Sequence, residues 1–205
     1  MLHTMTSHLD SRPRHTPRLI LRPFRRRDVG PMHDAVSASL PELQPWLPWA
    51  LGYERSVAHR FIRDSASAWN DGRAFDFALR LPEEPDFHVG NVSIWPTSAP
   101  NRIGEVGYWI RSDLTGEGLG TEAAARTMEI GFDDLGYHKI VLRIAVGNER
   151  SDRIAKRLGF TYEGILRHEV KVSLAWIDHT QWSVLEDEWP DIKKQLVKDG
   201  VLLGQ

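Results

Sequence analysis

Three glycines stand at alternate positions just before a helix-forming run, in the stretch SDLTGEGLGTEAAAR at residues 112–126. The N-terminus of a helix carries unpaired N–H groups and a partial positive charge, so a loop that holds an anion there needs only backbone atoms. A tight strand-to-helix turn without a ligand is the alternative, but three glycines in five residues exceed what one turn requires. We therefore expect Gly116, Gly118 and Gly120 to build an anion site.

The identity of the anion stays open on this loop alone, although two familiar phosphate-binding patterns do not fit it. The dinucleotide fingerprint G-x-G-x-x-G differs from the G-x-G-x-G spacing present, and no Gly-Lys-Ser/Thr follows as in the Walker motif. A diphosphate held by successive backbone amides, without lysine or metal, is the remaining interpretation. The nine histidines lack ligand spacing and the chain has no cysteine, so we expect no metal site, no disulfide and no cysteine acyl carrier.

The segments around the loop predict a strand–helix–strand unit. Residues 103–110 and 139–146 have the composition of strands, and the second is apolar enough to be covered on both faces. The helix between them, about residues 121–135, places Met128, Phe132 and Leu135 on one face and charged residues such as Glu122 and Glu129 on the other. Such a unit makes its two strands parallel neighbours with a right-handed crossover.

The rest of the chain adds strands and helices to the same sheet. We expect strands at residues 19–22, 75–81, 89–95, 161–166 and 176–185, and helices after Asp28, at about 151–158 and from Asp191. The segment LPELQPWLPWA at residues 40–50, with two tryptophans between prolines, is expected to be irregular and to cover a core edge or line a pocket. The predicted sheet is therefore mixed.

Bulk composition limits the protein class. The 205 residues, 41% hydrophobic and 26% charged, indicate one domain, which we place at residues 16–205 behind a flexible tail at residues 1–15. A formal net charge of −2 gives no global attraction to nucleic acid or anionic lipid. No segment has the apolar length of a signal peptide or membrane span, and the absence of cysteine fits a cytoplasmic location.

Five separated stretches carry a resemblance to a known family. They are TPRLILRPF at residues 16–24, QPWLPW at 44–49, GEVGYWI at 104–110, the glycine loop at 116–120, and NERSDRIAKRLGFTYEGILR at 148–167. In this order they resemble the GNAT acetyltransferase superfamily, and within it the RimJ/RimL-type N-acetyltransferases. The resemblance implies an α/β fold of the α+β type, with a mixed, centrally parallel, twisted sheet of about six to seven strands and helices on both faces.

The resemblance also implies acetyl-CoA as co-substrate. Its diphosphate would be held by the backbone amides of the glycine loop, and its thioester carbonyl by backbone N–H groups in the gap between the two parallel strands. The residues implied in cofactor binding are Tyr108, Trp109, Ile110, Gly116, Glu117, Gly118, Leu119, Gly120, Thr121, Asn148 and Ser151. Thr115 stands where the family pattern usually has Gln or Arg, so one side-chain contact is missing.

Two residues are candidates for the chemistry of acyl transfer. Glu105 is the candidate general base, directly or through a water, and its alternative is an edge carboxylate facing solvent or paired with an arginine. The tyrosine that many relatives use as acid is absent, because Ala155 stands at that position. The resemblance implies Ser151 as the proton donor to the leaving thiolate, its alternative being a cap of its own helix, while Asn148 would bond the cofactor or fix the turn.

The acceptor site is the least determined part. We expect Trp46, Trp49, Phe77, Asn91 and Glu105 to line it. A modest carboxylate suffices for an α-amine, whose reference pKa of about 7.7–8.0 lies below the value of about 10.4 for lysine.

Three functions remain as alternatives. The first is acetylation of a protein or peptide N-terminal amine, by direct attack without an acyl-enzyme. The second is acetyl or succinyl transfer to a small amine such as an antibiotic or polyamine. The third is a non-catalytic acyl-CoA-binding module. Because relatives are often dimers, the resemblance allows a homodimer, although nothing in the sequence shows an interface.

Overall fold

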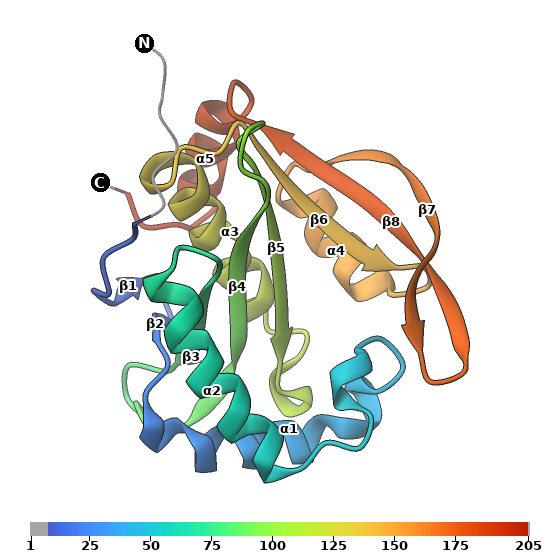
Figure 1. Cartoon of the computed structure of the whole chain (residues 1–205). Coiled ribbons are helices and arrows are strands. Elements are labelled where there is room, and N and C mark those ends of the chain that lie inside the picture. Colours follow the sequence, from blue (N-terminus) through green and yellow to red (C-terminus); the bar gives the residue numbers. More distant parts are fainter. Residues whose placement is uncertain (1–7, 205) are drawn as a thin grey trace.

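An eight-stranded sheet in the order β1-β2-β3-β4-β5-β6-β8-β7 runs through the computed structural model, which describes residues 8–204 (Figure 1). The strands are β1 (Arg14–His15), β2 (Ile20–Pro23), β3 (Phe75–Arg80), β4 (His88–Ser98), β5 (Ile103–Ile110), β6 (Lys139–Ala145), β7 (Thr161–Val172) and β8 (Ala175–Leu185). The helices are α1 (Val29–Leu43), α2 (Arg55–Asn70), α3 (Leu119–Glu129), α4 (Glu149–Arg157) and α5 (Trp189–Lys198). Single turns lie at η1 (Arg26–Asp28), η2 (Pro48–Ala50), η3 (Ser112–Leu114) and η4 (Ile130–Asp134).

The sheet is mixed, as the sequence predicts. All neighbouring strands pair antiparallel except β5 and β6, which are parallel and are joined by α3. The observed strand count exceeds the expected six to seven because the two-residue β1 pairs with β2. The predicted mixed sheet with a parallel pair near its centre is therefore confirmed.

Helices cover both faces of the sheet (Figure 1). Successive side chains of a strand point to opposite faces, and β5 shows which helices lie where. Trp109 packs with residues of α1 and α2, whereas its neighbour Tyr108 packs against the cluster that contains α3. The fold thus places α1 and α2 on the face of Trp109, and α3 on the face of Tyr108.

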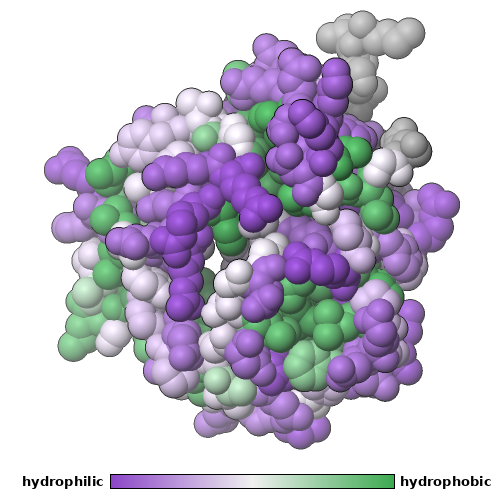
Figure 2. Space-filling model, turned by 180° about the vertical axis from the view of Figure 1, so that it is seen from behind, coloured by the Kyte–Doolittle hydropathy of each residue, from purple (hydrophilic) through white to green (hydrophobic). Residues whose placement is uncertain are grey.

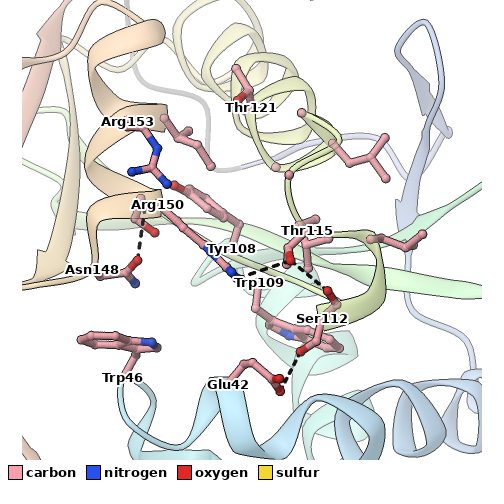
Figure 3. Close-up of a pocket in the computed structure, with 18 of the residues that line it drawn as sticks. Glu42, Trp46, Tyr108, Trp109, Ser112, Thr115, Thr121, Asn148, Arg150 and Arg153 are labelled. Atoms are coloured by element: carbon pink, nitrogen blue, oxygen red, sulfur yellow. Dashed lines mark hydrogen bonds between the residues drawn. The ribbon is translucent and has the colours of Figure 1, made fainter.

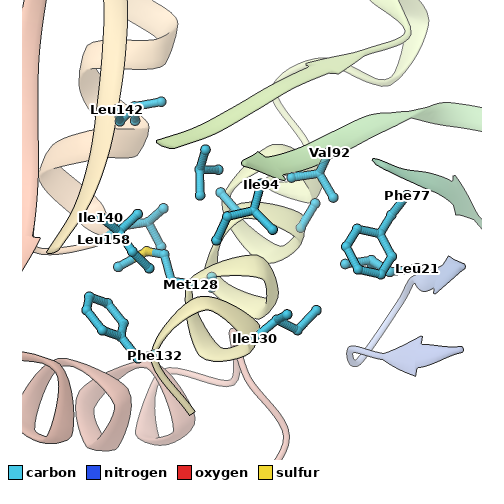
Figure 4. Packing of buried hydrophobic residues seen from close by; sticks show 14 of the residues in the cluster. Leu21, Phe77, Val92, Ile94, Met128, Ile130, Phe132, Ile140, Leu142 and Leu158 are labelled. Atoms are coloured by element: carbon cyan, nitrogen blue, oxygen red, sulfur yellow. The ribbon is translucent and has the colours of Figure 1, made fainter. Parts of the chain in front are cut away.

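The apolar face predicted for α3 forms part of the core. Met128 and Leu135 are almost completely buried, and Phe132 stacks on Trp189 of α5 with ring centroids 5.2 Å apart. Figure 4 shows Met128 beside Ile140 of β6, below the sheet. This packing fixes α3 under β5 and β6, and hence fixes the loop that precedes it.

Two charged residues of the same helix, Glu122 and Glu129, are buried, although the sequence pattern placed them on the face opposite the core. Glu122 and Glu129 are 2% and 8% exposed. The chain around residues 16–18 covers Glu122, and Lys193 of α5 pairs with Glu129 at 2.8 Å. Because each carboxylate has a cationic partner, its burial is tolerated.

Two further segments differ from the sequence expectation. Residues 40–43, expected to be irregular, continue α1 with Pro41 inside it, and Leu43 of this last turn is buried. Residues 55–70, for which the sequence pattern predicted no element, form α2 and bury Ile62 and Trp69.

The expected tail is only partly within the described residues, since residues 1–7 lie outside them. From residue 8 on, Leu9 is buried and its carbonyl accepts a hydrogen bond from the Trp69 indole at 3.2 Å. None of the helices in residues 8–204 has the length and apolarity needed to cross a membrane.

Candidate active site

The glycine loop needs its glycines for two physical reasons. Gly116 and Gly118 have φ of +93° and +83°, a left-handed conformation that residues with a Cβ rarely adopt. Gly120 lies inside the first turn of α3, where a Cβ would come 3.2 Å from Ile154 of α4. A Cβ on Gly116 would meet nothing within 4 Å, so the space in front of the loop is open.

This geometry presents backbone N–H groups to the open space. Helix α3 begins at Leu119 and has Gly118 as its N-cap, so the first amides of the helix have no carbonyl one turn earlier. Glu122 N–H is the first in the series to reach a loop carbonyl, that of Gly118, at 3.1 Å. The amides before it and the positive end of the helix suit a diphosphate, so the loop fits the cofactor that the resemblance implies.

Arg18 and Glu122 hold the loop in place from the side. The buried Glu122 carboxylate accepts hydrogen bonds from the Arg18 Nε at 2.8 Å and the Arg18 backbone N–H at 2.7 Å, and one from the Thr16 hydroxyl. The Arg18 Nη1 also donates to the carbonyl of Glu117 at 2.9 Å. One arginine therefore connects the loop backbone to the first turn of α3.

The two parallel strands separate beside the loop. Pairing of β5 with β6 covers only Ile103–Lys139, Gly104–Ile140 and Glu105–Val141, although both strands continue beyond it. From residue 106 onward the β6-facing edge of β5 is unpaired, which leaves backbone N–H and C=O groups available to a ligand. Glu105 stands at the point of separation, on the same face of β5 as Trp109.

The environment of Glu105 raises its pKa. Burial disfavours the charged carboxylate, Arg143 opposes this effect, and Glu169 adds to it by repulsion. The Arg143 Nη1 is 3.6 Å from the Glu105 Oε2 and 3.0 Å from the Glu169 Oε1. Arg143 is therefore closer to Glu169, and Glu105 keeps a carboxylate with raised basicity.

At the N-terminus of α4, the Asn148 side chain caps the helix and the Ser151 side chain does not. Asn148 is the N-cap, and its Oδ1 accepts a hydrogen bond from the Ser151 N–H at 3.2 Å. Asn148 thus fixes the turn, and the cap is not made by the Ser151 side chain. Beside Ser151 lies the Tyr108 hydroxyl, which makes no hydrogen bond of good geometry within the described residues and whose pKa burial raises to about 12.

These parts share one cavity of about 500 Å³ (Figure 3). Of the residues predicted to bind the cofactor, ten line it: Tyr108, Trp109, Ile110, Gly116, Gly118, Leu119, Gly120, Thr121, Asn148 and Ser151. Trp46 closes its far end, near Asn148. Seen from behind in Figure 2, the molecular surface is hollowed beside a strongly hydrophilic ridge.

Five predicted residues do not line this cavity. Phe77 is 1% exposed and packs on Trp69 in the core, so it forms no acceptor wall. Asn91 is buried and its Oδ1 lies 2.8 Å from the His88 Nε2, so its amide is engaged inside the fold. Glu105 lies at the strand separation, and Glu117 contributes its carbonyl to Arg18.

Trp49 also lies outside the cavity lining. It is 37% exposed, next to Trp109 with ring centroids 6.1 Å apart. Among residues 8–204, no three His, Asp or Glu side chains lie close enough together to hold a metal ion.

Comparison with known proteins identifies the family. A family model described as an acetyltransferase (GNAT) domain matches residues 18–161, more than half of the chain. The chain belongs to the GNAT acetyltransferase family. A solved structure of Mycobacterium smegmatis RimJ in complex with CoA-disulfide matches this GNAT fold with a TM-score of 0.80 and 27% identity, over 89% of each chain.

Two curated relatives place the GNAT domain among N-acetyltransferases. The [ribosomal protein uS5]-alanine N-acetyltransferase of Escherichia coli (strain K12) is 26% identical over 186 residues, which are 85% of this chain and 91% of that protein. YdaF of Bacillus subtilis (strain 168) is 33% identical over 100 residues, which are 49% of this chain and 55% of YdaF. The chain therefore matches about half the length of YdaF.

Sequence reasoning missed the charged residues of this GNAT cavity. Arg150, Arg153 and Arg157 of α4 and Glu42 of α1 line it. The spacing of the arginines, three and four residues apart, is the signal that would have placed them on one helix face. The arginine spacing does not show that this helix face points toward the glycine loop, because that depends on how α4 packs in the fold.

Proposed function

We propose that this GNAT protein transfers an acetyl group from acetyl-CoA to the N-terminal amine of a protein or peptide. The observation that carries the proposal is the shared cavity, in which the free amides of α3 lie next to the unpaired edge of β5. When bound, acetyl-CoA supplies an acyl group activated as a thioester. The loop amides hold its diphosphate, and the β5 edge orients its acyl end.

Glu105 and Ser151 have complementary roles in this proposal. Glu105 accepts, directly or through a water, the proton that the amine loses as its nitrogen bonds to the acyl carbon. Ser151 donates a proton to the sulfur as the carbon–sulfur bond breaks. The raised pKa of Glu105 makes it a stronger base toward an α-amine, whose reference pKa is about 7.7–8.0.

The surface beside the catalytic end supports a peptide acceptor. Trp49 and Leu51 are 37% and 40% exposed near η2, and Ile165 and Trp176 on the β7–β8 hairpin are 54% and 55% exposed. The hairpin strand β7 contacts η2, so these apolar side chains lie on neighbouring elements. An open apolar surface suits a peptide better than a small cation, which would need an enclosed acidic pocket.

A thiol-release assay with acetyl-CoA tests the proposal. The panel contains a lysine-free peptide with a free N-terminus, a lysine-containing peptide with a blocked N-terminus, and spermidine as a polyamine. The same panel with succinyl-CoA tests the donor. We expect release of thiol with acetyl-CoA and the first peptide. A preference for spermidine, or for succinyl-CoA, would contradict the proposal.

A further inference from the structure

The glycine loop, residues 115–120, has no basic side chain of its own, and the structure brings one to it from α4. The charged residues nearest the loop in sequence, Asp113, Glu117 and Glu122, are all acidic. Two arginines close to the loop already have acidic partners: Arg111 pairs with Asp113 at 2.8 Å, and Arg18 pairs with Glu122 at 2.8 Å. Backbone amides provide hydrogen bonds but only partial charge.

Arg150 extends from the first turn of α4 across the cavity to this loop (Figure 3). Its Nη1 donates to the Thr115 Oγ1 at 3.3 Å, at the position where the loop lacks a basic side chain. Thr115 in turn donates to the carbonyl of Ser112 at 2.8 Å, and the Ser112 hydroxyl donates to Glu42 at 3.0 Å. The Arg150 guanidinium is therefore held over the cavity by one long hydrogen bond to an uncharged acceptor, the Thr115 hydroxyl.

The cavity is electropositive although the protein is not. Its charged lining residues are three arginines of α4 and Glu42, whereas the whole chain has a formal net charge of −2. Arg153 lies 3.7 Å from Glu149, and both side chains are largely exposed. Focusing of positive charge in a concave site favours an anionic ligand, and a guanidinium forms bidentate hydrogen bonds with phosphate oxygens.

We propose that Arg150 supplies from α4 the side-chain contact to the diphosphate of coenzyme A that Thr115 leaves out of the glycine loop. This inference rests on the proposed function for the identity of the ligand. The bond to Thr115 is exchanged for charge-assisted bonds when the diphosphate binds. The glycine loop and α4 then bind the diphosphate from opposite walls of the cavity.

Calorimetric titration of the full chain with coenzyme A and with pantetheine, which lacks the diphosphate, tests the inference. We expect Arg150→Ala to weaken coenzyme A binding about tenfold, equivalent to about 1.4 kcal/mol. Binding of pantetheine should be the same as in the unchanged protein. The difference for coenzyme A should shrink at 1 M salt, because screening acts on exposed charges.

A reciprocal exchange separates this role from a structural one. The double variant Thr115→Arg/Arg150→Ala, which moves the guanidinium from α4 to the loop, should recover most of the lost affinity. Arg63→Ala is the matched control, because Arg63 is an exposed arginine on α2 whose only partner is its neighbour Asp64 within residues 8–204. It should bind coenzyme A like the unchanged protein.

The inference is overturned if Arg150→Ala has no effect, or if it weakens pantetheine and coenzyme A equally. Failure of the reciprocal exchange to recover affinity would also contradict it. These binding measurements do not require turnover. A protein that binds coenzyme A through Arg150 but acetylates no amine would contradict the proposed function while supporting this inference.

Discussion

The identity of the general base can be tested by moving the pKa of Glu105 in both directions without changing Glu105 itself. A base must be deprotonated to accept a proton, so activity is present above the Glu105 pKa and is lost as the pH falls through it. Removing the positive charge of Arg143 destabilises the carboxylate and raises this pKa. Removing the negative charge of Glu169 lowers it, and also frees Arg143 to approach Glu105.

The size of the shift follows from the geometry. Unit charges 3.6 Å apart, the distance from the Arg143 Nη1 to the Glu105 Oε2, attract by about 1.2 kcal/mol in water, equivalent to about 0.8 pH unit. An effective dielectric constant of 20 would give about four times more. Because the Arg143 side chain is 34% exposed, solvent screens the pair. We therefore expect Arg143→Gln to move the acidic limb up by about one pH unit.

The assay is the pH dependence of kcat/KM between about pH 4.5 and 8 with one peptide acceptor, so that the ionisation of the amine is common to all variants. Glu169→Gln should move the acidic limb down. Lys139→Gln is the control, because Lys139 lies on the same strand and pairs with Glu163 at 2.6 Å instead. A limb that stays in place in both variants, or moves the same way in both, would refute the assignment of Glu105.

Three further predictions follow from single contacts. Gly118→Val should destabilise the protein by about 1–2 kcal/mol, because φ is +83°, and should abolish coenzyme A binding; retained affinity in titration calorimetry would contradict the role of the loop. Ser151→Ala should lower kcat at least tenfold without changing the melting temperature, because the Asn148 cap bonds the Ser151 backbone N–H; an unchanged kcat would exclude the hydroxyl as proton donor. Burial lowers the pKa of His88 to about 3, so the unfolded chain takes up a proton below about pH 6.5 that the folded chain does not, and stability should fall by about 2 kcal/mol between pH 6.5 and 5. His88→Gln should flatten this part of a denaturant-unfolding series, and an equally steep fall would show that other groups cause it.

Local sequence patterns predicted most of the fold. Alternating and continuous apolar runs located seven of the eight strands, because each run has to be buried on one or both faces of the sheet. Helix α2 was missed although its sequence has a helical pattern, with Ile62 and Trp69 on the buried face and Arg63 on the exposed one. Burial of Glu122 was missed because its partner, Arg18, is about a hundred residues away in the sequence.

The candidate site was predictable where backbone conformation determines it. The glycine spacing indicated the loop at the N-terminus of α3, because glycine is the residue that most readily adopts the positive φ found at Gly116 and Gly118. Phe77 and Asn91 were expected in the acceptor site only from their positions on neighbouring strands, and the structure buries both side chains. Arg150 reaches Thr115 through the packing of α4 beside α3, a long-range relation that no local pattern contains.

A crystal structure with coenzyme A bound tests the central claim most directly. We expect the diphosphate within hydrogen-bond distance of the backbone amides at the start of α3, and the pantetheine arm along the unpaired edge of β5 beyond Glu105. A coenzyme A molecule bound elsewhere, with the helix N-terminus free and the gap between β5 and β6 empty, would contradict the account.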